Sequence, residues 1–198
     1  MIASSLMGTK SSEFVIKQGP EVSLQELETS VDFQQLSIHL YGREVPQPRL
    51  VAWYGPCAYT YSRLTLPPRT MPPILSELAK IVSEQAEEAF NSVMCNLYRN
   101  GSDSVSWHAD DEAIFERDPI IASLSIGAPR KFVARHNVTK EKQSWELGHG
   151  SLLIMGRGVQ PNYQHAIMKT KKSVGPRINL TFRKVPEWVT KIYHTGDK

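Results

Sequence analysis

The chain has 198 residues, and 23 lysines and arginines against 20 aspartates and glutamates give it a formal net charge of +3. That length predicts one globular domain, and the small charge permits a polyanionic partner without requiring one. Only Cys57 and Cys95 occur, which excludes a disulfide scaffold and indicates a reducing compartment. No stretch reaches the roughly 18 apolar residues of a membrane span. We therefore expect a cytoplasmic protein, or a nuclear one if the source is eukaryotic, without membrane contact.

The first elements predicted along the chain are a flexible lead over residues 1–20 and then a short helix. The lead is polar and has no periodic apolar pattern. Ser23 and Glu26 fit a capping box, and apolar residues follow at helical spacing. We expect a single domain over 21–185.

From residue 38 to 66 the composition turns to aromatics, arginines and prolines with alternating polarity, which predicts strands joined by loops. Pro72 and Pro73 then open the best-supported helix, whose apolar residues share one face as far as Phe90. Gly, Pro and charged turns divide the rest into short strands, a density typical of a sandwich or barrel. The predicted strands are 92–99, 104–109, 119–126, 130–136, 143–147, 151–155 and 176–184, followed by a basic tail over 186–198.

The last predicted strand carries polar and apolar residues in strict alternation. Period-2 spacing places Arg177, Asn179, Thr181 and Arg183 on one face, with three apolar residues on the other. Such a strand supplies a polar, cationic wall inside an otherwise apolar barrel, and its arginines indicate an anionic ligand. The alternative interpretation is that this strand lies at the edge of a sheet and that its polar face contacts solvent.

A metal site is indicated by His108 and Asp110, which lie two residues apart at a strand end, and by His165 further along the chain. Two imidazoles and one carboxylate form the facial triad that holds non-haem Fe(II) with open positions. Zn²⁺ is the competing metal, but zinc would not account for an arginine-rich strand aimed at the same cavity. Asn96 and Tyr98 share one face of another strand and could hold a small dicarboxylate.

From about residue 40 to 185 the chain resembles the AlkB family of Fe(II)/2-oxoglutarate dioxygenases, which repair alkylated nucleic acids. The motifs that carry the resemblance are Pro48–Gly55, Phe90–Ser92, Asn96–Tyr98, Trp107–Glu112, Ala122–Ser125, His149–Leu153 and Arg177–Arg183.

The resemblance implies a mainly β, α+β fold: a double-stranded β-helix, or jelly-roll, over 90–185, with flanking helices and an N-terminal nucleotide-recognition lid over 38–66. It also implies the cofactors Fe(II), 2-oxoglutarate and O2. By resemblance His108, Asp110 and His165 are the catalytic iron ligands. The implied 2-oxoglutarate residues are Asn96, Tyr98, Arg177, Asn179 and Arg183.

The implied activity is oxidative demethylation of N1-methyladenine and N3-methylcytosine in DNA, with RNA as an open second substrate, releasing succinate, CO2 and formaldehyde. A stacked base cannot reach the metal, so it must be flipped out or taken from a single strand. Arg49, Trp53 and Tyr54 are then expected to grip the strand, and Asp111 and Glu112 to line the lesion pocket. The alternatives are a hairpin whose aromatics are core residues and a solvated acidic turn.

Two other functions stay open at this point. A hydroxylase of a protein or small molecule would use the same chemistry, although the aromatic and arginine-rich segment argues against it. A non-catalytic nucleic-acid-binding module would have no reason to keep every metal and co-substrate residue. We expect the protein to act as a monomer.

Overall fold

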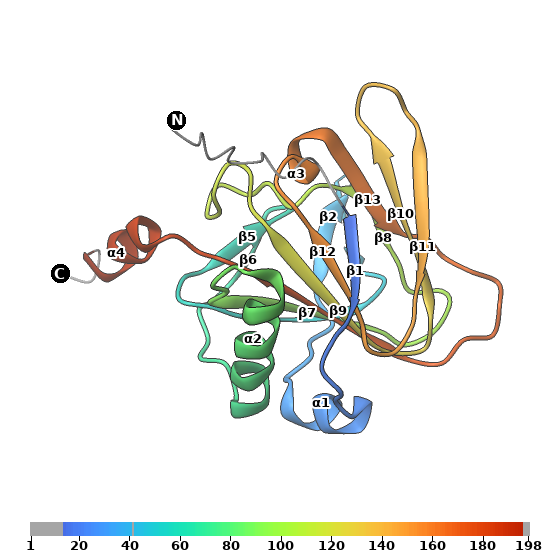
Figure 1. Cartoon of the computed structure of the whole chain (residues 1–198), viewed down its shortest axis with the longest axis horizontal. Helices are drawn as coiled ribbons and strands as arrows, with labels where there is room; N and C mark the ends of the chain where they lie inside the picture. The colour runs from blue at the N-terminus through green and yellow to red at the C-terminus, as the bar shows by residue number, and fades with distance from the viewer. Residues whose placement is uncertain (1–13, 41, 196–198) are drawn as a thin grey trace, which may run out of the picture.

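The computed structural model describes residues 14–40 and 42–195, which form two antiparallel sheets that face one another, with helices on the outer side of the larger sheet (Figure 1). The larger sheet has six strands in the order β1 (Phe14–Gln18), β12 (Ser151–Met155), β9 (Ile121–Gly127), β14 (Arg177–Arg183), β7 (Ser92–Tyr98) and β4 (Leu50–Tyr54). The smaller has four, in the order β11 (Lys142–Leu147), β10 (Arg130–His136), β13 (Tyr163–Ile167) and β8 (Val105–His108).

Two short hairpins and four helices complete the described ranges. The hairpins are β2 (Ser37–Leu40) with β3 (Arg43–Pro46), and β5 (Tyr59–Tyr61) with β6 (Leu64–Leu66). The helices are α1 (Leu24–Ser30), α2 (Pro73–Ala86), α3 (Val159–Asn162) and α4 (Glu187–Thr195). No helix in these ranges is long and apolar enough to cross a membrane.

The main core lies between the six-stranded sheet and the helices α1 and α2. Pro73 starts α2 where its missing N–H costs no hydrogen bond, and Leu75, Leu78 and Val82 then face the sheet. The opposite sides of strands β7, β9 and β14 are therefore free to face the smaller sheet, because successive residues of a strand alternate between faces. A second apolar cluster, which includes Phe132 and Leu153, seals the space between the two sheets at one end.

The seven strands predicted after residue 90 all occur, and their ends lie within two residues of the predicted ones. Facing antiparallel sheets are the architecture that the resemblance implied, so the predicted fold class is confirmed.

Three local predictions are wrong. Residues 14–18 of the expected flexible lead form strand β1, which pairs with β12 from Phe14 to Gln18; residues 1–13 lie outside the described residues. Ser23 precedes α1, but its side chain makes no capping hydrogen bond. The expected tail contains helix α4, and Val189 packs into the cluster around Trp53. These elements gain their order from packing against distant strands, which local patterns do not record.

Candidate active site

The metal-ligand candidates meet where two strands of the smaller sheet lie side by side. His108 ends β8 and is the register partner of His165 in β13, so both imidazoles point to the same side. Asp110 follows two residues after β8. Its Oδ1 lies 3.7 Å from His108 Nε2, and its Oδ2 lies 3.9 Å from His165 Nε2. The ligand atoms of all three lie within 4.8 Å of one another.

Neighbouring groups orient the three side chains toward a shared point. His108 Nδ1 lies 2.8 Å from the carbonyl oxygen of Ser106, which sets Nδ1 as the donor and leaves Nε2 as the free lone pair. The backbone N–H of Asp110 donates to Gln160 Oε1 at 2.9 Å. Burial alone would raise the pKa of Asp110, but Arg183 and the two imidazoles outweigh burial and hold this pKa well below its usual range. The carboxylate is thus ready to bind a cation.

Burial also lowers the pKa of His165 to about 3, because its ring is enclosed and stacked against Phe132. The imidazole is therefore neutral at physiological pH, as a metal ligand must be. A site of two imidazoles and one carboxylate fits Fe(II) with open positions, and this fit rests on the donor set and its spacing.

The polar wall predicted from the sequence exists, and strand register builds it. Strand β14 lies between β7 and β9, so Arg177 is opposite Tyr98, and Asn179 is opposite both Asn96 and Ser125. The polar side chains of the three strands consequently form one continuous buried surface. They line a cavity of about 570 Å³ that also contains the three metal-ligand candidates.

Arg177 is the cation that most clearly lacks a partner on this wall. Its side chain is 1 % exposed, and Nη2 donates to Ser125 Oγ at 2.8 Å. Its Nε and Nη1 have no hydrogen-bond partner within the described ranges, and burial lowers its pKa to about 10. A buried cation with unpaired N–H groups destabilises the fold unless an anion accepts those hydrogen bonds. The unpaired N–H groups therefore indicate that Arg177 binds an anionic group, such as one carboxylate of a dicarboxylate.

The two asparagines on the wall differ in what they can still bind. Asn179 donates its amide to Ser123 Oγ at 2.7 Å and to the carbonyl oxygen of Leu124 at 3.1 Å, so its donors are used inside the sheet. The amide nitrogen of Asn96 has no such contact with any described residue. Of the two, Asn96 is the one that can donate to a ligand.

Arg183 lies at the metal end of the wall. Its Nη2 contacts Asp110 Oδ2 at 2.9 Å, and its Nη1 donates to the carbonyl oxygen of Thr181. Its Nε is buried without a partner in the part of the chain that the structure describes. Arg183 thus orients a metal ligand and lines the same cavity.

The rim opposite the wall joins an acid to aromatic rings. Tyr59 Oη donates to Glu112 Oε1 at 2.5 Å, while Glu112 Oε2 is buried and has no partner among the described residues. Burial, followed by the charge of Asp110, raises the pKa of Glu112. Asp111 also lines the cavity but is exposed. The rim therefore offers a cation or donor one buried carboxylate oxygen.

The predicted strand-gripping residues Trp53 and Tyr54 do not line the cavity. Trp53 is 1 % exposed and donates from Nε1 to the carbonyl oxygen of Cys57, whereas Tyr54 packs in the main core and its Oη accepts the N–H of Asp32. Both belong to β4, the edge strand of the larger sheet beside β7, and an apolar cluster on each face of this strand buries them. Their assignment to substrate binding is wrong, and the alternative of core aromatics is correct.

Arg49, the third residue of that set, does line the cavity, where it contacts a residue of the polar wall. Its Nε donates to Asn96 Oδ1 at 2.7 Å. The structure therefore connects it to the polar wall.

Some residues of the site were not predicted. Gln160 follows a loop and carries no local signal. Ser123 and Ser125 did carry one, because polar residues at period 2 interrupt the apolar run of β9. Tyr59 was one of several tyrosines in the lid segment, and sequence alone did not separate it from Tyr54.

A metal-binding triad and a cationic wall inside two facing sheets define a class of metal-dependent oxygenases. The family model described as the 2OG-Fe(II) oxygenase superfamily matches residues 13–183. Alpha-ketoglutarate-dependent dioxygenase alkB homolog 3 of Homo sapiens is 47 % identical over 149 residues, which are 70 % of this chain and 52 % of that protein. DNA oxidative demethylase ALKBH2 of Homo sapiens is 36 % identical over 174 residues, 81 % of this chain and 67 % of that protein.

The chain belongs to the 2OG-Fe(II) oxygenase superfamily and, within it, to the AlkB family. A solved structure of OsALKBH1 shares the fold, with a TM-score of 0.57 and 18 % identity, and covers 81 % of this chain and 88 % of that one. The chain spans about half the length of the alkB homolog 3 relatives that it matches.

Proposed function

We propose that the protein is an Fe(II)/2-oxoglutarate dioxygenase that removes methyl groups from N1-methyladenine and N3-methylcytosine in DNA, with RNA strands as a second substrate. The observation that carries this proposal is the cavity itself. The metal triad, Arg177 with its unpaired donors and Glu112 with its unpaired oxygen all line one space of about 570 Å³.

The co-substrate end of the cavity is defined by Arg177. Its unpaired N–H groups would donate charge-assisted hydrogen bonds to one carboxylate of 2-oxoglutarate, with the amide of Asn96 and the phenol of Tyr98 nearby on β7. His108, Asp110 and His165 would hold Fe(II). When bound, Fe(II) and 2-oxoglutarate supply with O2 the oxidation of the methyl C–H bond, and succinate, CO2 and formaldehyde leave as products.

The substrate end is defined by Glu112 and the aromatic hairpin. Both methylated bases carry a positive charge, and a buried carboxylate favours a cationic ring over its neutral, unmethylated form. Tyr59 holds Glu112 in place, and stacking of Tyr59 on Tyr61 extends the aromatic surface, with ring centroids 5.3 Å apart. A base of a duplex reaches this depth only when it is flipped out.

The names of the relatives, which include a DNA oxidative demethylase, support a nucleic-acid substrate over a protein or a metabolite. A DNA substrate in turn favours action in the compartment that holds DNA, which is the nucleus in a eukaryote. We propose a monomer, because one chain supplies the whole metal triad and the polar wall.

A panel of methylated DNA and RNA strands tests the proposal. Mass spectrometry should show loss of the methyl group from N1-methyladenine and N3-methylcytosine only with Fe(II) and 2-oxoglutarate present. The matched control is Asp110→Asn, which keeps the shape of the side chain and removes its charge. If the wild-type protein hydroxylates peptides or metabolites but leaves every methylated strand unchanged, the substrate class is wrong.

A further inference from the structure

Arg49 lies just before strand β4 and reaches across to strand β7 beneath the co-substrate end of the cavity. Its Nε donates to Asn96 Oδ1 at 2.7 Å, and its Nη1 donates to the carbonyl oxygen of Ser104 at 3.4 Å. Arg49 is only partly exposed, and Asn96 is 8 % exposed. The guanidinium therefore connects the polar wall to the loop between β7 and β8.

This contact decides which way the amide of Asn96 faces. An arginine side chain can only donate hydrogen bonds, so it must face the carbonyl oxygen of the amide and not its nitrogen. The two N–H donors of Asn96 are thereby left for an acceptor in the cavity. Without Arg49 the amide could rotate by half a turn and present its oxygen to an anionic co-substrate, which would repel it.

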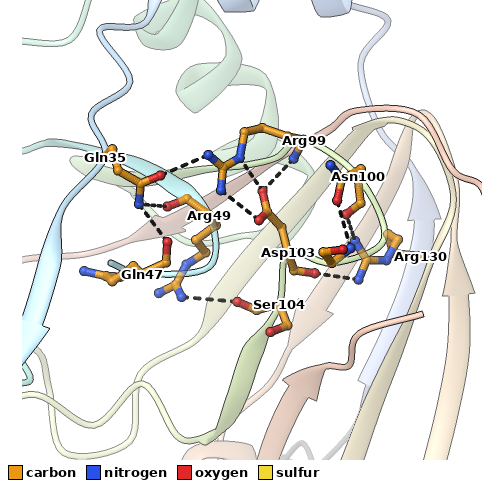
Figure 2. Close-up of polar contacts among 9 residues, drawn as sticks. Gln35, Gln47, Arg49, Arg99, Asn100, Asp103, Ser104 and Arg130 are labelled. Carbon is orange, nitrogen blue, oxygen red and sulfur yellow. Dashed lines mark hydrogen bonds and ion pairs between the residues drawn. The ribbon is translucent and has the colours of Figure 1, made fainter. Parts of the chain in front are cut away.

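Arg49 is itself held in place from two directions (Figure 2). Gln35 Nε2 contacts the carbonyl oxygens of Gln47 and Arg49 at 2.7 and 3.5 Å, and Gln35 Oε1 accepts from Arg99 Nη1 at 3.0 Å. Arg99 forms a two-pronged contact with Asp103, the residue before Ser104. Both ends of Arg49, its backbone and its guanidinium, are thus tied to the same loop.

The loop is also fixed on its far side. Arg130, which is 3 % exposed, donates to the carbonyl oxygens of Asn100 and Asp103 (Figure 2). It also donates to the carbonyl oxygen of Met168. The N–H of Ser104 donates to the carbonyl oxygen of Pro48 at 2.8 Å. The carbonyl that receives Arg49 is therefore part of a rigid frame, and the guanidinium has one defined position.

We propose that Arg49 is a positioning residue for 2-oxoglutarate, which acts by fixing the amide of Asn96, and that it does not grip the nucleic-acid backbone. This inference rests on the co-substrate site of the proposed function. A loss of one oriented donor to a charged ligand corresponds to about a tenfold change in affinity. Arg49 should exert this effect entirely through Asn96.

A double-mutant cycle tests the proposal with no turnover involved. Isothermal titration calorimetry would measure 2-oxoglutarate binding to Mn(II)-loaded wild-type protein, Arg49→Met, Asn96→Ala and the double variant. We expect Arg49→Met to weaken binding about tenfold and the double variant to bind no more weakly than Asn96→Ala alone. Arg69→Met, another partly buried arginine that stacks on Tyr54 and does not line the cavity, is the matched control and should bind like wild type.

The cycle separates this inference from the proposed function. If the wild-type protein does not bind 2-oxoglutarate, the proposed function fails. If it binds and Arg49→Met binds equally well, or if the two single effects add in the double variant, the positioning role is wrong. If Arg49→Met does not fold, Arg49→Lys replaces it in the same cycle, because one ammonium cannot reproduce the guanidinium fork. An Arg49 variant that binds single-stranded nucleic acid more weakly but binds 2-oxoglutarate normally would instead show that Arg49 contacts a backbone phosphate.

Discussion

The wall and the rim of the cavity are built by different kinds of structure. On the wall, Arg177 and Asn179 stand on β14 and Asn96 stands on the adjacent long strand β7, and hydrogen-bonded register fixes which side chains face each other. On the rim, Tyr59 comes from a hairpin of three-residue strands, and Glu112 comes from a segment outside any strand. The proposed co-substrate site therefore depends on sheet register, whereas the proposed substrate site depends on a few side-chain contacts between short segments.

The largest effect should come from the metal ligands, on which wall and rim both depend. We expect His108→Ala, Asp110→Ala and His165→Ala each to abolish succinate release, because losing one of three protein ligands removes the geometry of the site. Thermal unfolding in the absence of metal should show that each variant folds. Near-normal succinate release with added Fe(II) in any one of them would contradict the triad.

Tyr54→Ala tests whether Tyr54 belongs to the core or to the rim of the cavity. We expect it to destabilise the fold by about 3–5 kcal/mol, the range for truncating a large buried aromatic. Tyr54→Phe, which loses only the hydrogen bond from Asp32, should cost about 1 kcal/mol. Chemical denaturation measures both changes. The core position is refuted if Tyr54→Ala keeps its stability and instead weakens binding of a methylated strand.

Arg177→Lys tests the wall alone. A lysine ammonium cannot reproduce the planar two-bond fit to a carboxylate, so we expect a loss of about 1.5–3 kcal/mol in 2-oxoglutarate binding. The Michaelis constant for 2-oxoglutarate should rise by about 10- to 100-fold. The Michaelis constant for the methylated strand should stay unchanged and serves as the internal control. An unchanged Michaelis constant for 2-oxoglutarate would mean that Arg183, and not Arg177, binds the carboxylate.

Glu112→Gln tests the rim alone and should have the smallest effect. The change removes the charge and keeps the shape, so we expect kcat/KM for N1-methyladenine strands to fall about tenfold, the scale of one charged hydrogen bond. Uncoupled decay of 2-oxoglutarate, which needs only the metal and the wall, should be unaffected. A parallel fall of both activities would mean that Glu112 supports the metal site and not the substrate.

The difference between wall and rim also explains which parts of the site could be predicted from the sequence. Alternation along 177–183 was sufficient to place Arg177 and Arg183 on one face, and His108 with Asp110 could be assigned from their spacing at a strand end. These features depend on local geometry. The hydrogen bond from Asn179 to Ser123 inside the sheet could not be predicted, because the two residues lie in strands more than fifty positions apart in the sequence.

Two of the predicted substrate-binding residues were misjudged for a related reason. Trp53 and Tyr54 sit in an aromatic, arginine-rich segment that looks like a nucleic-acid surface, but β4 pairs with β7 and its neighbours cover both faces. Composition cannot distinguish an exposed aromatic from a buried one. The orientation of Arg49 toward Asn96 likewise follows from a contact between residues 47 positions apart.

We propose that one cavity couples decay of 2-oxoglutarate at the wall to removal of a methyl group at the rim. The most direct test incubates the Fe(II)-loaded protein with a strand that carries a single N1-methyladenine and quantifies succinate, formaldehyde and repaired base together. We expect all three to form in equal amounts, and we expect succinate release to slow sharply with an unmethylated strand. Succinate that forms at the same rate with either strand, with no loss of the methyl group, would contradict it.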